Sequence, residues 1–127
     1  MACILIIDDE DLFRVMLRKF LEREGHTVVE AADGKEAIQK YKEATVDLVI
    51  TDILMPERDG IETIVSLRRE HPHLKIIAVS GGGDTGKLDF LPAAQHLGAV
   101  RTFKKPFDRR EFLDAVSEIL AEGEEQA

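Results

Sequence analysis

The sequence predicts an α/β fold in which helices cover both faces of one doubly wound parallel β-sheet. Short apolar runs rich in β-branched residues recur along the 127 residues, and their spacing leaves room for a helix and two loops after each run. Several runs are almost continuously apolar, which is typical of strands covered on both faces. The runs comprise residues 3–7, 27–31, 46–51, 76–79 and 99–103.

The segments between these runs show the period of amphipathic helices. After the first run, apolar residues recur at intervals of three and four and stop near Gly25, which favours a helix end. The same pattern follows Asp108 and Glu111, whose spacing is typical of a capping box. Shorter stretches occupy residues 35–44 and 61–70. The fourth of the five expected helices, at residues 87–97, is interrupted by a proline. The apolar positions of the first and last helices are Phe13, Met16, Leu17, Phe20 and Leu21, and Phe112, Ala115, Val116, Ile119 and Leu120.

Composition excludes several classes of protein. The chain has the length of one domain, which we place at residues 1–121, before an acidic tail at residues 122–127. A formal charge of −8 disfavours direct binding to nucleic acid. No apolar run reaches the roughly 18 residues of a membrane-spanning helix, so we expect a cytoplasmic protein without membrane contact. The single cysteine, Cys3, cannot form an internal disulfide and is expected to be a buried apolar residue.

Polar side chains stand at the carboxyl ends of four predicted strands, where ligands bind in open parallel sheets. Asp8 and Asp9 follow the first strand, Asp52 the third, Ser80 the fourth, and two lysines at 104–105 the fifth. The helix dipole explains acidic residues at a helix start, but not the convergence of three aspartates from two strand ends. Two carboxylates about 4 Å apart repel by roughly 4 kcal/mol at an effective dielectric constant near 20. A divalent cation would offset this repulsion, and Mg²⁺ is the physiological candidate because it keeps waters that a phosphate can replace.

Such a site is suited to phosphoryl transfer. A carboxylate such as that of Asp52 can act as a nucleophile and form an aspartyl phosphate. A metal ion would neutralise the transferring oxygens, while a lysine ammonium and the Ser80 hydroxyl would bind the others. These residues would suffice, because phosphoryl transfer depends mainly on positioning and electrostatic stabilisation.

Four ordered motifs resemble those of response-regulator receiver domains, which include chemotaxis-type CheY-like proteins. They are Ile-Leu-Ile-Ile-Asp-Asp-Glu at residues 4–10, the segment at residues 47–60, Val-Ser-Gly at residues 79–81 and Lys-Pro-Phe at residues 105–107. The match runs from about residue 3 to residue 120. The resemblance implies a flavodoxin-like fold with strand order 2-1-3-4-5. It also implies a signalling phosphoprotein that catalyses only its own aspartate phosphorylation and dephosphorylation, and no enzyme in the usual sense.

The resemblance assigns roles to individual residues. Asp52 would be the phosphoacceptor, and Ser80 would contact the phosphoryl group. The metal ion would be Mg²⁺, for which Mn²⁺ can substitute. Its ligands would be Asp9 and Asp52 directly, Asp8 through water, and the backbone carbonyl of Leu54.

Of the two lysines after the fifth strand, the resemblance selects Lys105 as the active-site lysine because it directly precedes Pro106. The peptide bond between them is typically cis in the family, which is accessible at a cost of about 0.5 to 1 kcal/mol and would direct Lys105 to the pocket. Lys104 is then expected to be exposed. Thr102 stands where family members usually carry an aromatic residue whose ring turns inward on activation. An aromatic switch is therefore not available at that position.

The implied function is a phosphorylation-dependent switch of a two-component phosphorelay. A histidine kinase or histidine phosphotransfer protein would supply the phosphoryl group, and residues 81–86 would close toward it. This closure would change a face formed by the fourth helix, fifth strand and fifth helix, which controls a downstream protein or a covalently linked output domain. We place on this face a basic cluster of Arg101, Lys104, Arg109 and Arg110.

Two alternatives for the setting of the domain stay open, as does its oligomeric state. The chain is either a single-domain regulator or the receiver part of a larger response regulator or hybrid kinase. It is also either a terminal switch or a relay intermediate that passes its phosphate on to a histidine. We expect a monomer or a phosphorylation-dependent dimer.

Other interpretations fit the residues less well. Gly81, Gly83 and Gly86 match a dinucleotide-binding motif, but the motif follows the fourth strand and Pro92 interrupts the next segment. A flavin-binding flavodoxin would share the fold, yet the chain has no Trp and one Tyr to stack the flavin ring. A phosphatase of the haloacid-dehalogenase type needs a second aspartate two residues after the nucleophile, where Leu54 stands.

Overall fold

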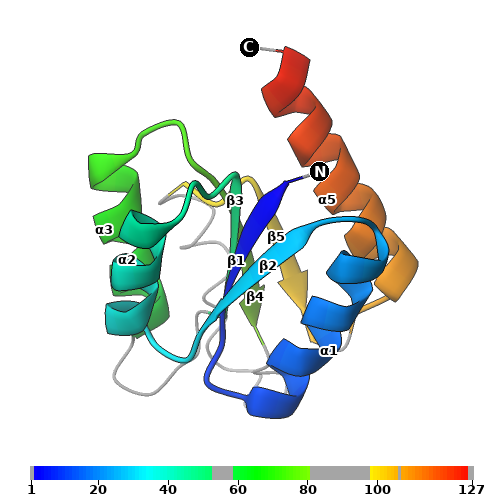
Figure 1. The fold of residues 1–127 in the computed structure, drawn as a ribbon, viewed down its shortest axis with the longest axis horizontal. Helices are drawn as coiled ribbons and strands as arrows, with labels where there is room; N and C mark the ends of the chain where they lie inside the picture. Colours follow the sequence, from blue (N-terminus) through cyan, green and yellow to red (C-terminus); the bar gives the residue numbers. More distant parts are fainter. Residues whose placement is uncertain (1, 53–58, 81–97, 106, 126–127) are drawn as a thin grey trace.

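The computed structural model describes residues 2–52, 59–80, 98–105 and 107–125, in which five strands form one parallel sheet (Figure 1). The order across the sheet is β2-β1-β3-β4-β5, and every neighbouring pair is parallel. The predicted flavodoxin-like order is therefore confirmed. The strands are β1 (Cys3–Ile7), β2 (Thr27–Ala31), β3 (Leu48–Asp52), β4 (Lys75–Ser80) and β5 (Arg101–Lys104).

Helices cover both faces of this sheet (Figure 1). Helices α2 (Gly34–Glu43) and α3 (Asp59–Glu70) lie on one face, and α1 (Asp11–Arg23) and α5 (Arg109–Glu125) lie on the other. The predicted fourth helix at residues 87–97 lies outside the described residues. None of the described helices is long and apolar enough to cross a membrane.

The final helix extends beyond its predicted apolar pattern. That pattern stops at Leu120, whereas the backbone of α5 stays helical to Glu125. The helix thus enters the acidic segment at residues 122–127, and the proposed boundary between domain and tail stays a prediction.

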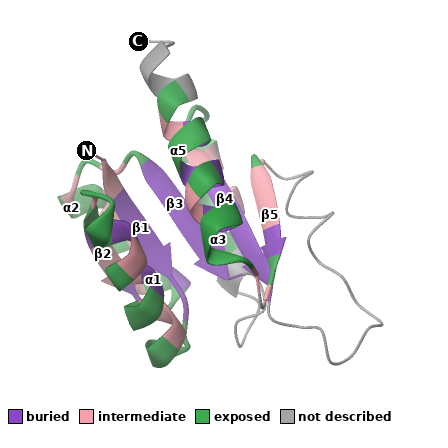
Figure 2. Ribbon diagram, turned by 90° about the vertical axis from the view of Figure 1, so that its right-hand side faces the viewer, coloured by how far each residue is buried: buried purple, intermediate pink, exposed green. Residues whose placement is uncertain are grey.

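Apolar residues of strands β1 to β4 alternate between two hydrophobic cores, whereas β5 places only Phe103 in a core. In β1, Ile4 and Ile6 pack with residues of α1 and α5, whereas Leu5 and Ile7 pack with residues of α2 and α3. All four are buried, and Figure 2 shows the strands between the helices as a largely buried layer. Because successive side chains of a strand point to opposite faces, a sheet covered on both sides needs apolar residues at consecutive positions. This explains the continuous apolar runs of the sequence.

Local signals set the ends of the helices. The Asp33 side chain caps α2 by accepting a hydrogen bond from the N–H of Glu36 at 2.8 Å. Asp108 caps α5 in the same way, accepting from the N–H of Glu111 at 3.0 Å, as the capping-box spacing predicts. Helix α1 is followed by Gly25, whose φ of 94° is a left-handed conformation that favours glycine.

Cys3 is less buried than its apolar surroundings in the sequence predict. It is the first residue of β1 and is half-buried, and its N–H donates to Asp47 Oδ2 at 2.9 Å. Burial and the charge of Asp47 raise the pKa of the thiol, so the protonated form is favoured. The prediction of full burial was wrong because the run begins at the rim of the sheet and not within the core.

Candidate functional site

The carboxyl ends of neighbouring strands bring the predicted polar residues to one edge of the sheet. Asp8 follows β1, Asp52 ends β3, Ser80 ends β4 and Lys105 follows β5. These four strands are adjacent and parallel, so their ends meet at the same edge. Asp8, Asp52 and Ser80 are buried, whereas Asp9 is exposed. The topology thus brings together, at one edge of the sheet, the residues that the sequence predicts there.

Lys105 joins two of these strand ends through its ammonium group. The Nζ atom lies 3.1 Å from a carboxylate oxygen of each of three residues, Asp8, Glu10 and Asp52. Its side chain is 13% exposed, so water screens these contacts only in part. Glu10 was not predicted as a site residue, because acidic residues at the start of a helix are explained by the helix dipole alone.

Two further contacts place the lysine. The backbone N–H of Lys105 donates to the carbonyl oxygen of Ser80 at 2.7 Å, which holds this residue beside the end of β4. The Nζ atom lies 3.8 Å from the ring centroid of Phe13 in α1, a cation–π contact that the sequence did not reveal. The adjacent Lys104 is exposed, as predicted. Of the two lysines, Lys105 is the one that faces the carboxylates.

Three carboxylates lie close enough to share a metal ion. One oxygen each of Asp8, Asp9 and Asp52 lies within 4.8 Å of the others. Hard oxygen donors of this kind suit a divalent cation such as Mg²⁺. The single ammonium of Lys105 cannot neutralise these three groups together with Glu10. The site therefore carries an excess of negative charge that a divalent cation would offset.

Burial opposes the charges at this site. It raises the pKa of Asp8, the charge of Asp52 raises it further, and the N–H of Glu10 and the Lys105 ammonium lower it in part. For Lys105, burial lowers the pKa, but the charges of Asp52 and Asp8 outweigh burial and the net pKa is raised. The lysine is thus held in its charged form, while the ionised form of Asp8 is disfavoured. A bound cation would relieve that penalty.

Several predicted features lie outside the described residues. These are the backbone carbonyl of Leu54, Pro106 with the peptide bond that precedes it, and the glycine-rich segment at residues 81–86. The ligand, the cis bond and the loop closure assigned to them stay predictions.

Thr102 lies in β5, opposite Ala78 of β4, and is half-buried. The neighbouring aromatic residue, Phe103, is buried in the core between the sheet and helices α1 and α5. Its ring centroid lies 5.5 Å from that of Phe107 and 5.3 Å from that of Phe112. The aromatic side chain of this strand is thus held in the core, one residue after the position where the family usually carries one.

The predicted basic cluster is divided between two places. Arg101 lies 3.8 Å from Glu118, well along α5. Arg109 and Arg110 lie at the first turn of α5 and line a pocket between α1 and α5, together with Arg23. The prediction of one cluster was wrong, because Arg101 is the first residue of β5, whereas Arg109 and Arg110 follow the other end of that strand and begin α5.

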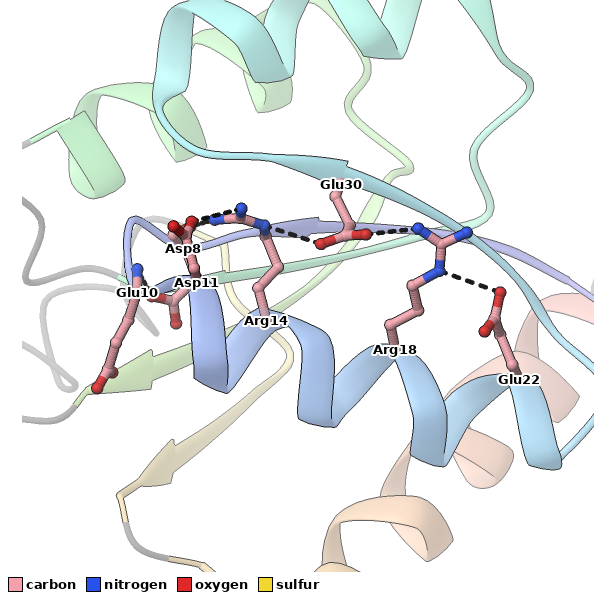
Figure 3. Close-up of polar contacts among 7 residues, drawn as sticks. All are labelled: Asp8, Glu10, Asp11, Arg14, Arg18, Glu22 and Glu30. Carbon is pink, nitrogen blue, oxygen red and sulfur yellow. Dashed lines mark hydrogen bonds and ion pairs between the residues drawn. The ribbon is translucent and has the colours of Figure 1, made fainter.

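A series of ion pairs, here called the ladder, joins α1 to β2 (Figure 3). Its members are Asp11, Arg14, Arg18 and Glu22 of α1 and Glu30 of β2. Arg14 lies 2.7 Å from Asp11 and 2.9 Å from Glu30 of β2. Arg18 lies 2.5 Å from the other carboxylate oxygen of Glu30 and 3.1 Å from Glu22. Within α1, the spacing of three residues between Asp11 and Arg14, and of four between Arg18 and Glu22, is a sequence signal for these two pairs. Glu30 comes from another element, so only the fold reveals its part.

Glu30 makes this ladder sensitive to acid. Burial raises the pKa of its carboxyl group, but hydrogen bonds from Arg18 and Arg14 outweigh burial, so the pKa lies below its usual 4.5. A lowered folded-state pKa gives a stabilisation that is present above the unfolded-state pKa and is lost as the pH falls through the folded value. We expect the free energy of unfolding, measured by urea titration at successively lower pH, to fall less steeply for Glu30→Gln than for the wild type. Parallel curves for the two proteins would contradict this.

The strand order and the aspartates and lysine at the strand ends define the class of protein, that of response-regulator receiver domains. The family model described as response regulator receiver domain matches residues 4–117, and the chain belongs to this family. Such domains act as signalling switches in two-component and phosphorelay systems.

Named relatives and a solved structure share most of this chain. The chain is 37% identical over 117 residues to the chemotaxis protein CheY of Halobacterium salinarum, covering 92% of this chain and 95% of that protein. It is 37% identical over 121 residues to the sensor kinase CckA of Brucella abortus, covering 94% of this chain but 12% of the kinase. The structure of response regulator protein TrrA from Thermotoga maritima in complex with Mg²⁺-BeF has a TM-score of 0.82 and 29% identity, over 94% of this chain and 99% of TrrA.

Proposed function

We propose that this chain is a switch in which Asp52 accepts a phosphoryl group in a reaction that requires Mg²⁺. The observation that carries the proposal is the convergence at the sheet edge. Carboxylate oxygens of Asp8, Asp9 and Asp52 lie within 4.8 Å of one another, and the Lys105 ammonium lies 3.1 Å from Asp52. Membership of the receiver family and the Mg²⁺-BeF complex of the relative TrrA support the same chemistry.

In the proposed reaction, a carboxylate oxygen of Asp52 attacks the phosphorus atom of a phosphohistidine on the donor protein. The P–N bond breaks, and the donor imidazole keeps the electron pair and takes up a proton. Asp8, Asp9 and Asp52 would hold Mg²⁺, with the Leu54 carbonyl as a further ligand. When bound, the ion supplies positive charge to the transferring oxygens.

Lys105 and Ser80 would bind the phosphoryl group on Asp52. The Lys105 ammonium, which binds the Asp52 carboxylate in the structure, would bind a phosphoryl oxygen instead. The Ser80 hydroxyl, at the end of the adjacent strand, would bind another. The added charge of about −2 favours whichever conformation offers these contacts, and residues 81–86 would close toward the phosphoryl group. The face around α5 and β5 would then change its affinity for a partner, with Thr102 and Pro106 at the transition between site and face.

The partners belong to the same proposal. In the cytoplasm, where we expect this chain to act, a histidine kinase or histidine phosphotransfer protein would donate the phosphoryl group, and a downstream protein or linked output domain would receive the signal. The match to a small part of the sensor kinase CckA favours, as a second setting, a receiver within a hybrid kinase. There the same Asp52 would pass its phosphate on to a histidine.

The proposal is tested by the intact mass of the protein after incubation with acetyl phosphate, with Mg²⁺ or with a chelator. We expect the wild type to gain one phosphoryl group only when Mg²⁺ is present, and Asp52→Asn to gain none. Asp114→Asn, a change of the same type at an exposed position of α5, is the matched control and should be labelled like the wild type. Equal labelling of Asp52→Asn and the control would contradict the proposal.

A further inference from the structure

Each polar group of Asp8 is bound by a different part of the fold. Its N–H donates to the carbonyl oxygen of Ala31 in β2 at 3.1 Å. Its Oδ1 accepts from the N–H of Glu10 at 2.8 Å, and its Oδ2 lies 3.1 Å from Lys105 Nζ. The backbone carbonyl oxygen accepts from Nη1 of Arg14 at 2.5 Å. Arg14 thus supplies the contact from helix α1.

The contact from Arg14 acts on the peptide plane between Asp8 and Asp9. Because a peptide group is planar, the carbonyl of Asp8 and the N–H of Asp9 turn together. Within the described part of the chain, the Asp9 side chain makes no hydrogen bond or ion pair, and it is exposed. Its carboxylate is therefore directed toward the metal site by the backbone, at the point where Arg14 holds that backbone.

Arg14 is itself held in one orientation (Figure 3). Each guanidinium nitrogen has its own acceptor: Nε donates to Glu30 at 2.9 Å, Nη1 to the Asp8 carbonyl, and Nη2 to Asp11 at 2.7 Å. The side chain is 15% exposed. Its two carboxylate partners hold the guanidinium in place, and its contact with Asp8 is a hydrogen bond to the backbone carbonyl. A lysine has one nitrogen and cannot span the three acceptors.

From these contacts we propose that Arg14 is a positioning residue for the metal site, which holds the Asp8 carbonyl so that Asp9 faces the cation. This role rests on the proposed function, because it assumes that Asp8 and Asp9 bind Mg²⁺. Groups that orient metal ligands without touching the metal commonly contribute about 10- to 100-fold to metal affinity.

Arg18 provides a matched control. It lies one turn further along α1 and pairs with the same carboxylate, that of Glu30, as well as with Glu22. Within the described residues it makes no contact with Asp8. Removal of either arginine breaks one arm of the ladder, but only removal of Arg14 releases the Asp8 carbonyl.

The test is the Mg²⁺ dissociation constant of the unphosphorylated full chain, measured by isothermal titration calorimetry for Arg14→Gln, Arg14→Lys and Arg18→Gln. We expect both Arg14 variants to bind Mg²⁺ about 10-fold or more weakly, while Arg18→Gln keeps the wild-type affinity. The backbone amide resonances of Asp9 and Glu10, recorded by NMR without metal, should shift in the Arg14 variants and stay unchanged in Arg18→Gln. If Arg14→Gln does not fold, Arg14→Lys alone decides the question.

The possible failures are distinguishable. Wild-type Mg²⁺ affinity in a folded Arg14 variant would overturn the positioning role and leave the proposed function intact. An equal loss of affinity in the Arg14 and Arg18 variants would also overturn it, because the ladder would then act only as a general support. Absence of Mg²⁺ binding by the wild type would overturn the proposed function and this role together.

Discussion

Replacement of Lys105 by methionine is expected to slow the Mg²⁺-dependent phosphorylation of the protein by about 100-fold or more. The ammonium lies 3.1 Å from carboxylate oxygens of Asp52 and Asp8, where charge develops during the proposed transfer. Methionine keeps the apolar length of the side chain and removes the charge. The rate is measured from the intact mass of the protein at successive times after addition of acetyl phosphate and Mg²⁺.

The adjacent lysine supplies the control for this prediction. Lys104 is exposed and makes no ion pair among the described residues, so Lys104→Met should react at the wild-type rate. A Lys105→Met protein that is phosphorylated as fast as Lys104→Met would show that the ammonium takes no part in the transfer.

The same Lys105→Met variant tests the balance of charge between Lys105 and the carboxylates of Asp8 and Asp52. Without metal, it leaves the buried carboxylates of Asp8 and Asp52 without their cation, a change that typically costs about 3 to 5 kcal/mol. We expect a lower free energy of unfolding in urea when a chelator is present, and partial recovery when Mg²⁺ is added. Recovery follows because a bound divalent cation would replace the lost positive charge. An equal loss of unfolding free energy with and without Mg²⁺ would contradict the binding of a cation beside Asp8 and Asp52.

Replacement of Phe112 by alanine is expected to reduce the free energy of unfolding by about 3 to 5 kcal/mol. Phe112 is fully buried in the first turn of α5, with ring centroids of Phe107 and Phe103 at 4.9 Å and 5.3 Å. The change removes the largest apolar side chain that attaches α5 to the sheet and leaves a cavity. Urea unfolding followed by circular dichroism measures the effect.

Leu113 provides the comparison for Phe112. It is the next residue of the same helix but is only half-buried, so Leu113→Ala should cost clearly less. A loss for Phe112→Ala no greater than that for Leu113→Ala would contradict the assignment of Phe112 to the core.

The sequence predicted the sheet well because its signals are local. In β1, apolar residues at every position from Ile4 to Ile7 indicate a strand covered on both faces, and the structure confirms this. Once parallel strands are predicted, the position of Asp8 and Asp52 at one edge follows from the direction of the strands. The choice between Lys104 and Lys105 came from resemblance to the receiver family, and the structure shows that Lys105 faces the carboxylates.

Side-chain contacts between different helices and strands could not be predicted from the sequence. Glu10 follows the aspartates directly, but its pairing with Lys105 joins residues 95 positions apart. The pairing of Arg14 with Glu30 depends on how α1 lies against β2, which no periodicity reveals. The separation of Arg101 in β5 from Arg109 and Arg110 in α5 has the same cause. In each case the contact depends on how two helices or strands lie relative to each other, which the sequence does not show.

The central claim, that Asp52 carries the phosphoryl group, is tested most directly by locating the modification. Sodium borohydride reduces an aspartyl phosphate to homoserine, so the phosphorylated wild type is reduced, digested and sequenced by tandem mass spectrometry. We predict homoserine at position 52 and unchanged aspartate at Asp8 and Asp9. Homoserine at position 8 or 9, with Asp52 intact, would contradict the claim.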